Sequence, residues 1–165
     1  MKKNYTILLA AATLLFAACD PGYTCDNVIN NASNHKVSVI PLAYEVYPSP
    51  RDISAHDTVY LYGITVLDKN EKSFVMSSGG LGSASREECI YNMRQYLGDS
   101  VKFLFDNEKS IVFYATDTTG VSPYNFDAPF YHYVQKLRVR RGNVGDPYYG
   151  TLTLNIDDDF YQLAN

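Results

Sequence analysis

The chain has 165 residues, enough for one domain with a sizeable core, and it carries 14 Lys and Arg against 18 Asp and Glu, a net charge of −4. This acidic balance argues against nucleic acid or an anionic lipid surface as the partner. The 15 Tyr and 8 Phe, with no Trp, favour a β-rich fold because aromatic residues suit pleated, half-buried strands, although a Tyr-lined binding face would use the same composition.

The first 18 residues have the pattern of an export signal. Lys2 and Lys3 supply positive charge, and residues 7–18 form an uncharged apolar stretch. This stretch is shorter than the about 20 residues that a helix needs to cross a bilayer. We therefore expect residues 1–18 to be a signal peptide that is removed.

A cysteine directly follows this apolar stretch. Ala17 and Ala18 precede Cys19, a combination that resembles the bacterial lipobox, in which the cysteine thiol receives diacylglycerol. The sequence thus predicts lipidation at Cys19 and a short tether over residues 19–26, and two or more acyl chains would make the anchoring effectively permanent. An ordinary secretory signal with an accidental cysteine is the alternative.

The first part of the remaining chain predicts strands separated by turns. Alternating or continuous apolar residues, bounded by Asn-rich, Pro-rich and charged segments, give this pattern. The expected strands are residues 27–30, 37–44, 58–67 and 72–76, with a loop at 45–56 and the last two strands joined as a hairpin.

The segment 85–97 is the clearest helical pattern in the chain. Ser85 and Glu88 have the spacing of a capping box, and Gly98 is a suitable stop. One face carries Cys89, Met93, Tyr96 and Leu97.

Further strands and a short acidic helical turn follow. Residues 101–105 and 111–115 predict a hairpin in the middle of the sheet, and strands are expected at 131–140 and 148–156 before the turn at 157–165. The sequence predicts a mainly β fold, a sandwich-like antiparallel domain of about seven strands with one inserted helix over residues 27–165, and α+β is the alternative.

No cofactor, metal or catalytic constellation is predicted. Gly80 and Gly82 stand between a strand and a helix as in a dinucleotide fingerprint, but Ser85 occupies the third glycine position. The three histidines, His35, His56 and His132, have no metal-ligand spacing and no nucleophile partner. The acidic run at 157–159 lacks the spacing of a calcium loop and instead suits the first turn of a helix.

Several stretches together resemble the small envelope lipoproteins of unknown function found in Bacteroidetes, in particular Bacteroidales. They are the lipobox, "INNASNHKVSV", "GDSVKFLFDNEKSIVFY", "YNFDAPF" and the closing "TLTLNIDDDFYQLA". The resemblance covers most of the chain after the signal and implies a lipid-anchored protein with a β-rich domain and no known activity. We expect an outer-membrane location, with the surface and the periplasmic side both open.

Two functions remain open. The first is a non-enzymatic interaction module that binds a protein or glycan through Tyr-rich strands and the loops at 45–56 and 116–130. The second is a hydrolase or an enzyme inhibitor whose site is assembled from scattered residues. A deep pocket that holds His132 with two carboxylates would favour the enzyme, and an exposed aromatic patch would favour binding.

Two further sets of residues are candidates for covalent modification. Cys25 and Cys89 could form a disulfide in an exported chain, or Cys89 could pack as a free thiol on the apolar helix face. Asp-Ser or Asp-Thr followed by an apolar residue or Thr resembles the O-glycosylation site of Bacteroidetes envelope proteins, which makes Thr118, Thr58 and Ser100 candidates in that order. Chance is the alternative, because Asp and Thr are common at turns.

Lipidation can be tested directly. Cells fed an alkyne fatty acid should label the wild-type protein but not Cys19→Ala, because the thiol is the expected site of acylation. Equal labelling of the two proteins would show that Cys19 is not the acylated residue.

Overall fold

The computed structural model describes residues 22–44, 58–59, 63–81, 84–137 and 148–165. The predicted loop at 45–56 and the end of the strand predicted at 131–140 lie outside these residues. The described elements, in chain order, are β1 (Gly22–Asn31), β2 (Val37–Tyr44), β3 (Thr58–Val59), β4 (Thr65–Leu67), β5 (Lys72–Leu81), α2 (Arg86–Leu97), β6 (Ser100–Phe105), β7 (Lys109–Tyr114), β8 (Tyr131–Leu137), β9 (Tyr148–Ile156) and α3 (Asp158–Leu163).

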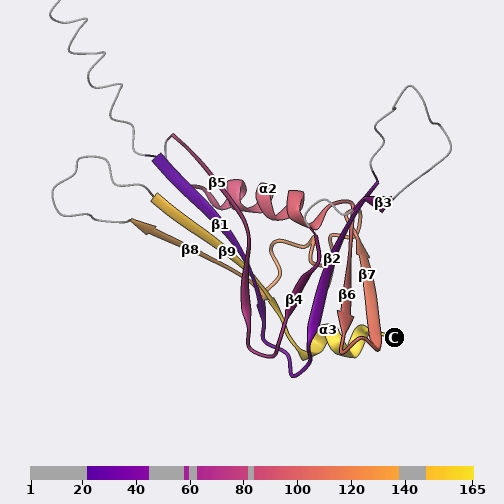
Figure 1. Ribbon diagram of the computed structural model, residues 1–165. Helices are drawn as coiled ribbons and strands as arrows, with labels where there is room; N and C mark the ends of the chain where they lie inside the picture. The colour runs from indigo at the N-terminus through magenta and orange to yellow at the C-terminus, as the bar shows by residue number, and fades with distance from the viewer. Residues whose placement is uncertain (1–21, 45–57, 60–62, 82–83, 138–147) are drawn as a thin grey trace, which may run out of the picture.

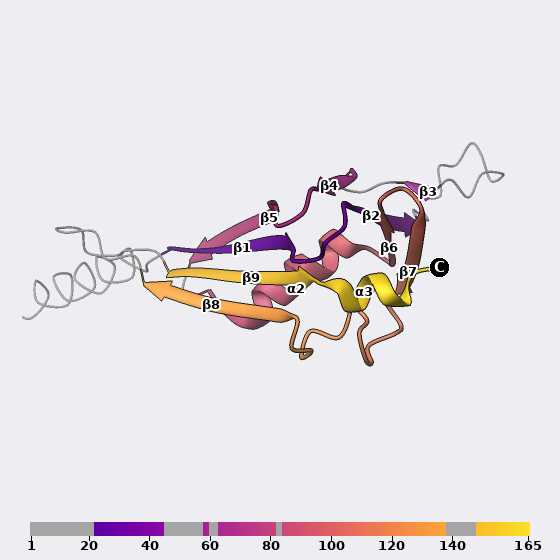
Figure 2. The same cartoon turned by 90° about the horizontal axis from the view of Figure 1, so that it is seen from below.

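The strands form two sheets, which confirms the mainly β, sandwich-like prediction. The first sheet has the order β5-β1-β9-β8, and the second has the order β3-β2-β6-β7 with β4 also paired to β2. The sheets meet at the turn between β1 and β2 and diverge from it, and α2 lies across the open side (Figure 1). Seen from below, the four strands of the first sheet lie side by side with α2 behind them (Figure 2).

One strand pair departs from the expected antiparallel arrangement. β1 and β9 run parallel, in register from Tyr23 with Tyr148 to Asn31 with Ile156. The other strand pairs of the two described sheets are antiparallel. Strands so far apart in sequence can pair in parallel because the intervening chain is long enough to cross over.

β1 is longer than the sequence predicts. It begins at Gly22 rather than at residue 27, so part of the expected tether is a strand. Its inward residues from Cys25 onward are fully buried: Cys25, Asn27, Ile29 and Asn31. Half of them are polar, so the sequence lacks the apolar pattern of a central strand. The strand is instead stabilised by pairing on both of its edges.

The hairpin predicted between residues 58–67 and 72–76 is wrong. β4 pairs with β2 in the second sheet, and β5 pairs with β1 in the first, so the chain changes sheet at the turn between them. β5 also continues beyond residue 76, the expected end of this strand, through Gly79 and Gly80. A Cβ on Gly80 would come within 2.8 Å of the Tyr23 ring, so the absence of a side chain there lets that ring lie against the strand.

α2 confirms the helix prediction. The Ser85 side chain accepts a hydrogen bond from the backbone N–H of Glu88, and Gly98 ends the helix with a positive φ of 70°. The Glu88 carboxylate accepts a hydrogen bond from the Tyr23 hydroxyl, which raises the pKa of that hydroxyl. This bond ties the helix start to β1.

The hairpin predicted at residues 101–115 is confirmed, but its predicted position in the middle of the sheet is wrong for the second strand. β6 and β7 pair in register around a turn in which Asp106 and Asn107 have positive φ, a conformation that Asp and Asn tolerate better than most residues. β6 is central, whereas β7 is an edge strand of the described sheet. Asn165 covers part of that edge through two backbone hydrogen bonds with Ser110.

The last elements follow the sequence closely. Leu152, Leu154 and Ile156 of β9 are fully buried, as their alternation predicts. α3 begins where the acidic turn was expected, with Asp157 as its N-cap.

The structure joins Cys25 of β1 to Cys89 of α2 by a disulfide, with 5.5 Å between the Cα atoms. Both residues are fully buried. Of the two arrangements that the sequence left open, the structure has the bonded one.

Thiol counting tests this bond. Denatured, unreduced protein from the native envelope should show no free thiol at Cys25 or Cys89. The double variant Cys25→Ala/Cys89→Ala should unfold more easily, by up to roughly 4 kcal/mol for a closed loop of about 65 residues. Two free thiols per chain would show that the cysteines are packed but not bonded.

Candidate functional site

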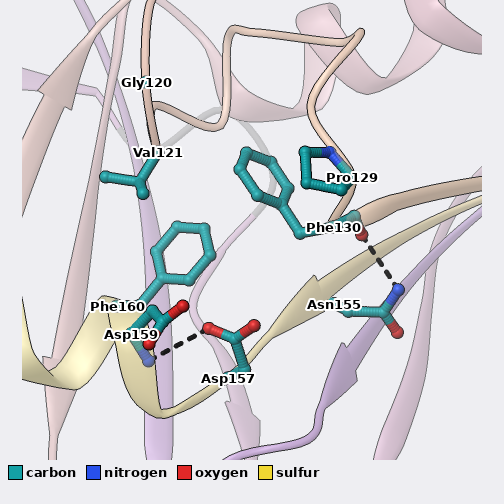
Figure 3. A pocket seen from close by; sticks show the side chains of 8 residues that line it. All are labelled: Gly120, Val121, Pro129, Phe130, Asn155, Asp157, Asp159 and Phe160. Atoms are coloured by element: carbon teal, nitrogen blue, oxygen red, sulfur yellow. Dashed lines mark hydrogen bonds between the residues drawn. The ribbon is translucent and has the colours of Figure 1, made fainter.

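A cavity of about 310 Å³ lies between the segment that follows β7 and the start of α3. Figure 3 shows Pro129 and Phe130 on one side of it and Asp157 and Asp159 on the other, with Phe160 beside Asp159. Its lining residues are Gly120, Val121, Pro129, Phe130, Asn155, Asp157, Asp159 and Phe160.

The segment between β7 and β8, which forms one wall, is held in place by internal hydrogen bonds. The side chain of Asp117 caps the backbone N–H of Thr119, and the Ser122 hydroxyl donates to the Asp117 carbonyl. Tyr124 is 2 % exposed, and its hydroxyl donates to the carbonyls of Leu97 and Gly98 at 3.1 Å. Burial raises the pKa of that hydroxyl. The wall is therefore anchored to the end of α2.

The apolar side of the cavity is continuous with the protein core. Phe160 is 1 % exposed and packs edge-to-face against Phe103 and Phe113. The Phe130 ring lies 5.2 Å from the Phe160 ring, centroid to centroid, at 71°. Because Phe160 is fixed by the core, the position of Phe130 is fixed as well.

The polar side consists of one amide and two carboxylates. The Asn155 side chain donates to the Phe130 carbonyl at 2.9 Å and accepts from the Asn30 side chain at 2.8 Å. Asp157 accepts the backbone N–H of Asp159 at 3.1 Å through one oxygen. None of the ion pairs in the described part of the chain involves Asp157 or Asp159.

The aspartate between these two has a different role. Both oxygens of Asp158 accept hydrogen bonds from Asn34, one from its backbone N–H and one from its side chain. These bonds lower the pKa of Asp158. Asp158 therefore fastens α3 to the turn between β1 and β2 and does not line the cavity.

A second polar cluster supports α3 from outside the cavity. The His35 ring stacks on Tyr161 at 3.5 Å, and its Nδ1 lies 2.6 Å from a carboxylate oxygen of Asp106. The bonds from His35 and from the Lys36 backbone lower the pKa of Asp106. The Lys109 ammonium group lies over the same Tyr161 ring, 4.9 Å from its centroid. These contacts position the helix that carries the acidic side of the cavity.

The residues singled out from sequence do not converge on this cavity. Cys19 and His56 lie outside the described residues, and His132 is exposed on β8 opposite Thr153. Neither of the two described histidines, His35 and His132, lines the cavity. Among the residues described, no three His, Cys, Asp or Glu side chains are grouped as metal ligands.

The glycosylation candidates differ in accessibility. Thr118 is exposed in the segment before the cavity. Ser100 is 3 % exposed at the start of β6, so its hydroxyl is closed to a transferase in the folded domain. Thr58 begins β3. Thr118 remains the first candidate, as a prediction.

Most of the tyrosines whose burial is described contribute to the core: Tyr96 and Tyr124 are buried, and Tyr23, Tyr131, Tyr133 and Tyr161 pack against it. Tyr96 is 1 % exposed, and burial raises its pKa to about 12 against the lowering effect of a hydrogen bond with Thr65. The exposed Tyr91 and Tyr114 lie on different elements, α2 and β7. These positions fit the fold explanation of the Tyr-rich composition.

Sequence reasoning anticipated one wall of the cavity and missed the other. The loop at 116–130 was expected to bind a partner, and four lining residues come from it. Asp157 and Asp159 were interpreted only as helix-capping charges. The signal that could have found them is that three consecutive acids exceed what one helix cap needs.

No family model matches the chain, and comparison with curated proteins and with solved structures finds no similar protein at a significant level. Neither helix in the described residues has the length and apolar character needed to cross a bilayer. The resemblance to Bacteroidales lipoproteins therefore stays a prediction.

Proposed function

We propose that the protein is a lipid-anchored binding module of the bacterial envelope, without catalytic activity, that holds part of a protein or glycan partner in the cavity beside Phe130. The observation that carries this proposal is a fixed cavity with unlike walls, one apolar and one acidic. Small, concave sites of this kind, with a few convergent polar groups, are the usual form of ligand sites.

The position of the cavity relative to the expected anchor supports the proposal. Gly22, the first residue of β1, follows Cys19 by three positions in the sequence. Asn155, which lines the cavity, pairs with Asn30 near the other end of β1. At ~3.3 Å per residue, the two ends of this strand are about 30 Å apart. A lipid on Cys19 would leave the cavity on the side away from the membrane.

The arrangement of the carboxylates favours binding over glycoside hydrolysis. Hydrolases of that type place two carboxyl groups on opposite sides of the bond that is cleaved. Asp157 and Asp159 project from a single turn, on the same side of the cavity (Figure 3). A hydrolase or an inhibitor remains the alternative, and no contact in the cavity favours it.

The envelope assignment rests on the sequence. The lipobox at Cys19 and the resemblance to Bacteroidales lipoproteins both support an outer-membrane location. In that setting, the module would face either the cell surface or the periplasm, and its partner would be another envelope component.

Filling the cavity tests the proposal. Val121 is 36 % exposed at the cavity wall, so Val121→Trp should occupy the cavity without disturbing the core. Affinity capture of the full lipidated protein from native membranes, followed by mass spectrometry of proteins and glycans, should find a partner that Val121→Trp loses by at least about tenfold, the loss expected for ~1.4 kcal/mol of contact energy.

The matched control is Tyr91→Trp, which adds a similar ring at a 62 % exposed position on α2. It should capture the partner as well as the wild type does. The same proteins and glycans bound by all three forms would contradict a binding role for the cavity.

A further inference from the structure

The two walls of the cavity differ in chemistry, and we infer that the cavity selects an organic cation carried on an apolar stem, the chemistry of a lysine or arginine side chain. This inference rests on the proposed function and specifies its ligand. Val121, Pro129 and Phe130 form the apolar wall, and Asp157 and Asp159 form the acidic wall.

The acidic wall has acceptor capacity that the protein itself does not use. One oxygen of Asp157 accepts the Asp159 backbone N–H. For the other oxygen of Asp157, and for both oxygens of Asp159, the described residues supply neither a hydrogen bond nor an ion pair. Bonds from a cationic donor to carboxylates are about twice as strong as neutral ones. An ammonium or guanidinium group would use these oxygens best.

The surrounding charge points to the same ligand. The neighbouring Asp158 adds a third carboxylate to the turn, although it is bonded to Asn34. The whole chain has a net charge of −4. Two carboxylates in the cavity lining and the net negative charge of the chain favour a basic partner over an anion, even though His35, Lys69 and Lys109 also lie near α3.

The cavity suits an organic cation with N–H donors and methylene groups better than it suits a metal ion. The described residues group no three side chains that could ligate a metal, so the cavity offers too few ligands for a bare metal ion. The phenylalanine wall instead suits methylene groups, which gain from leaving water. The described residues already include two cations placed over rings, Arg94 over Phe126 and Lys109 over Tyr161.

The size of the cavity limits what can enter. Its volume of about 310 Å³ is at the lower end of the ~300–1,000 Å³ range of ligand sites. A volume of this size suits one long side chain better than several sugar rings. Because the cavity lies away from the start of β1, a side chain on an extended partner could reach it without meeting the membrane.

The test is a titration of the full mature protein in detergent micelles, followed by NMR. The probes are Nα-acetyl-lysine methylamide, the arginine equivalent and Nα-acetyl-norleucine methylamide, which keeps the apolar stem but has no charge. We expect the two basic probes to bind at least about tenfold more tightly than the norleucine probe, and to weaken as salt is added. Equal affinity for lysine and norleucine would overturn the inference.

Variants assign the effect to the two carboxylates. Asp157→Asn/Asp159→Asn removes both charges while keeping a good N-cap for α3, and it should weaken lysine binding at least about tenfold. The matched control Glu87→Gln removes an exposed carboxylate from the first turn of α2 and should leave binding unchanged. Unchanged binding by the double Asn variant, or tighter binding of maltotriose than of the basic probes, would overturn the inference.

The two proposals fail separately, and one further probe identifies the source of the cation. If Val121→Trp loses the partner but the double Asn variant keeps it, the proposal of a binding cavity stands and the inference of a cationic ligand is wrong. A pentapeptide amide, Gly-Gly-Lys-Gly-Gly, and n-pentylamine are compared directly. Tighter binding of the peptide indicates that the ligand is a side chain of a protein partner. Tighter binding of the amine indicates a free amine. Either result agrees with a cation on an apolar stem.

Discussion

The parallel pairing of β1 with β9 is the constraint on which the rest of the structure depends. It joins the first described strand to the last, over nine residue pairs from Tyr23 to Asn31. β1 also pairs with β5 on its other edge and is joined to α2 by the Cys25–Cys89 disulfide. Since the two strands run in the same direction, both end on the side of the sheet where the cavity is built. The same pairing thus places the cavity at the end of the sheet away from the start of β1.

Asn31, at the end of β1, holds the two sheets together. Its side-chain nitrogen donates to the carbonyls of His35, Leu67 and Asp68, and its side-chain oxygen accepts from Ser33. These partners belong to the turn between β1 and β2, to the end of β4 and to the turn between β4 and β5, where the chain crosses between sheets. The residue is fully buried, so any bond left unmade would cost about 1–3 kcal/mol. A polar residue fits this junction because it satisfies several backbone carbonyls at once.

The elements that the sequence predicted are those with strong local patterns. α2 combines a serine cap, an apolar face and a stopping glycine, and β9 alternates Leu152, Leu154 and Ile156 toward the core. β1 and the second half of β5 have no such pattern. Polar residues occupy two of the four buried inward positions of β1, and glycines occupy β5 where Tyr23 approaches. Long-range pairing determines these strands, and a single sequence does not show it.

The cavity was half predictable for the same reason. A long polar segment between two strands is a common place for a binding loop, and residues 116–130 supplied one wall. The other wall depends on where α3 packs, which is set by the stacking of His35 on Tyr161 and by the bonds from Asn34 to Asp158. Those contacts link positions more than 120 residues apart. Asp157 and Asp159 therefore have an evident local role as capping charges, and their role in the cavity depends on the tertiary fold.

Hydrogen exchange of the native protein, read by mass spectrometry, tests the central claim most directly. If β1 is the central strand, its amides and those of β9 should be among the slowest to exchange and should become exposed together, because opening either strand breaks the same pairing. Slow exchange in β9, with fast exchange in β1 typical of a loosely held N-terminal segment, would contradict this account.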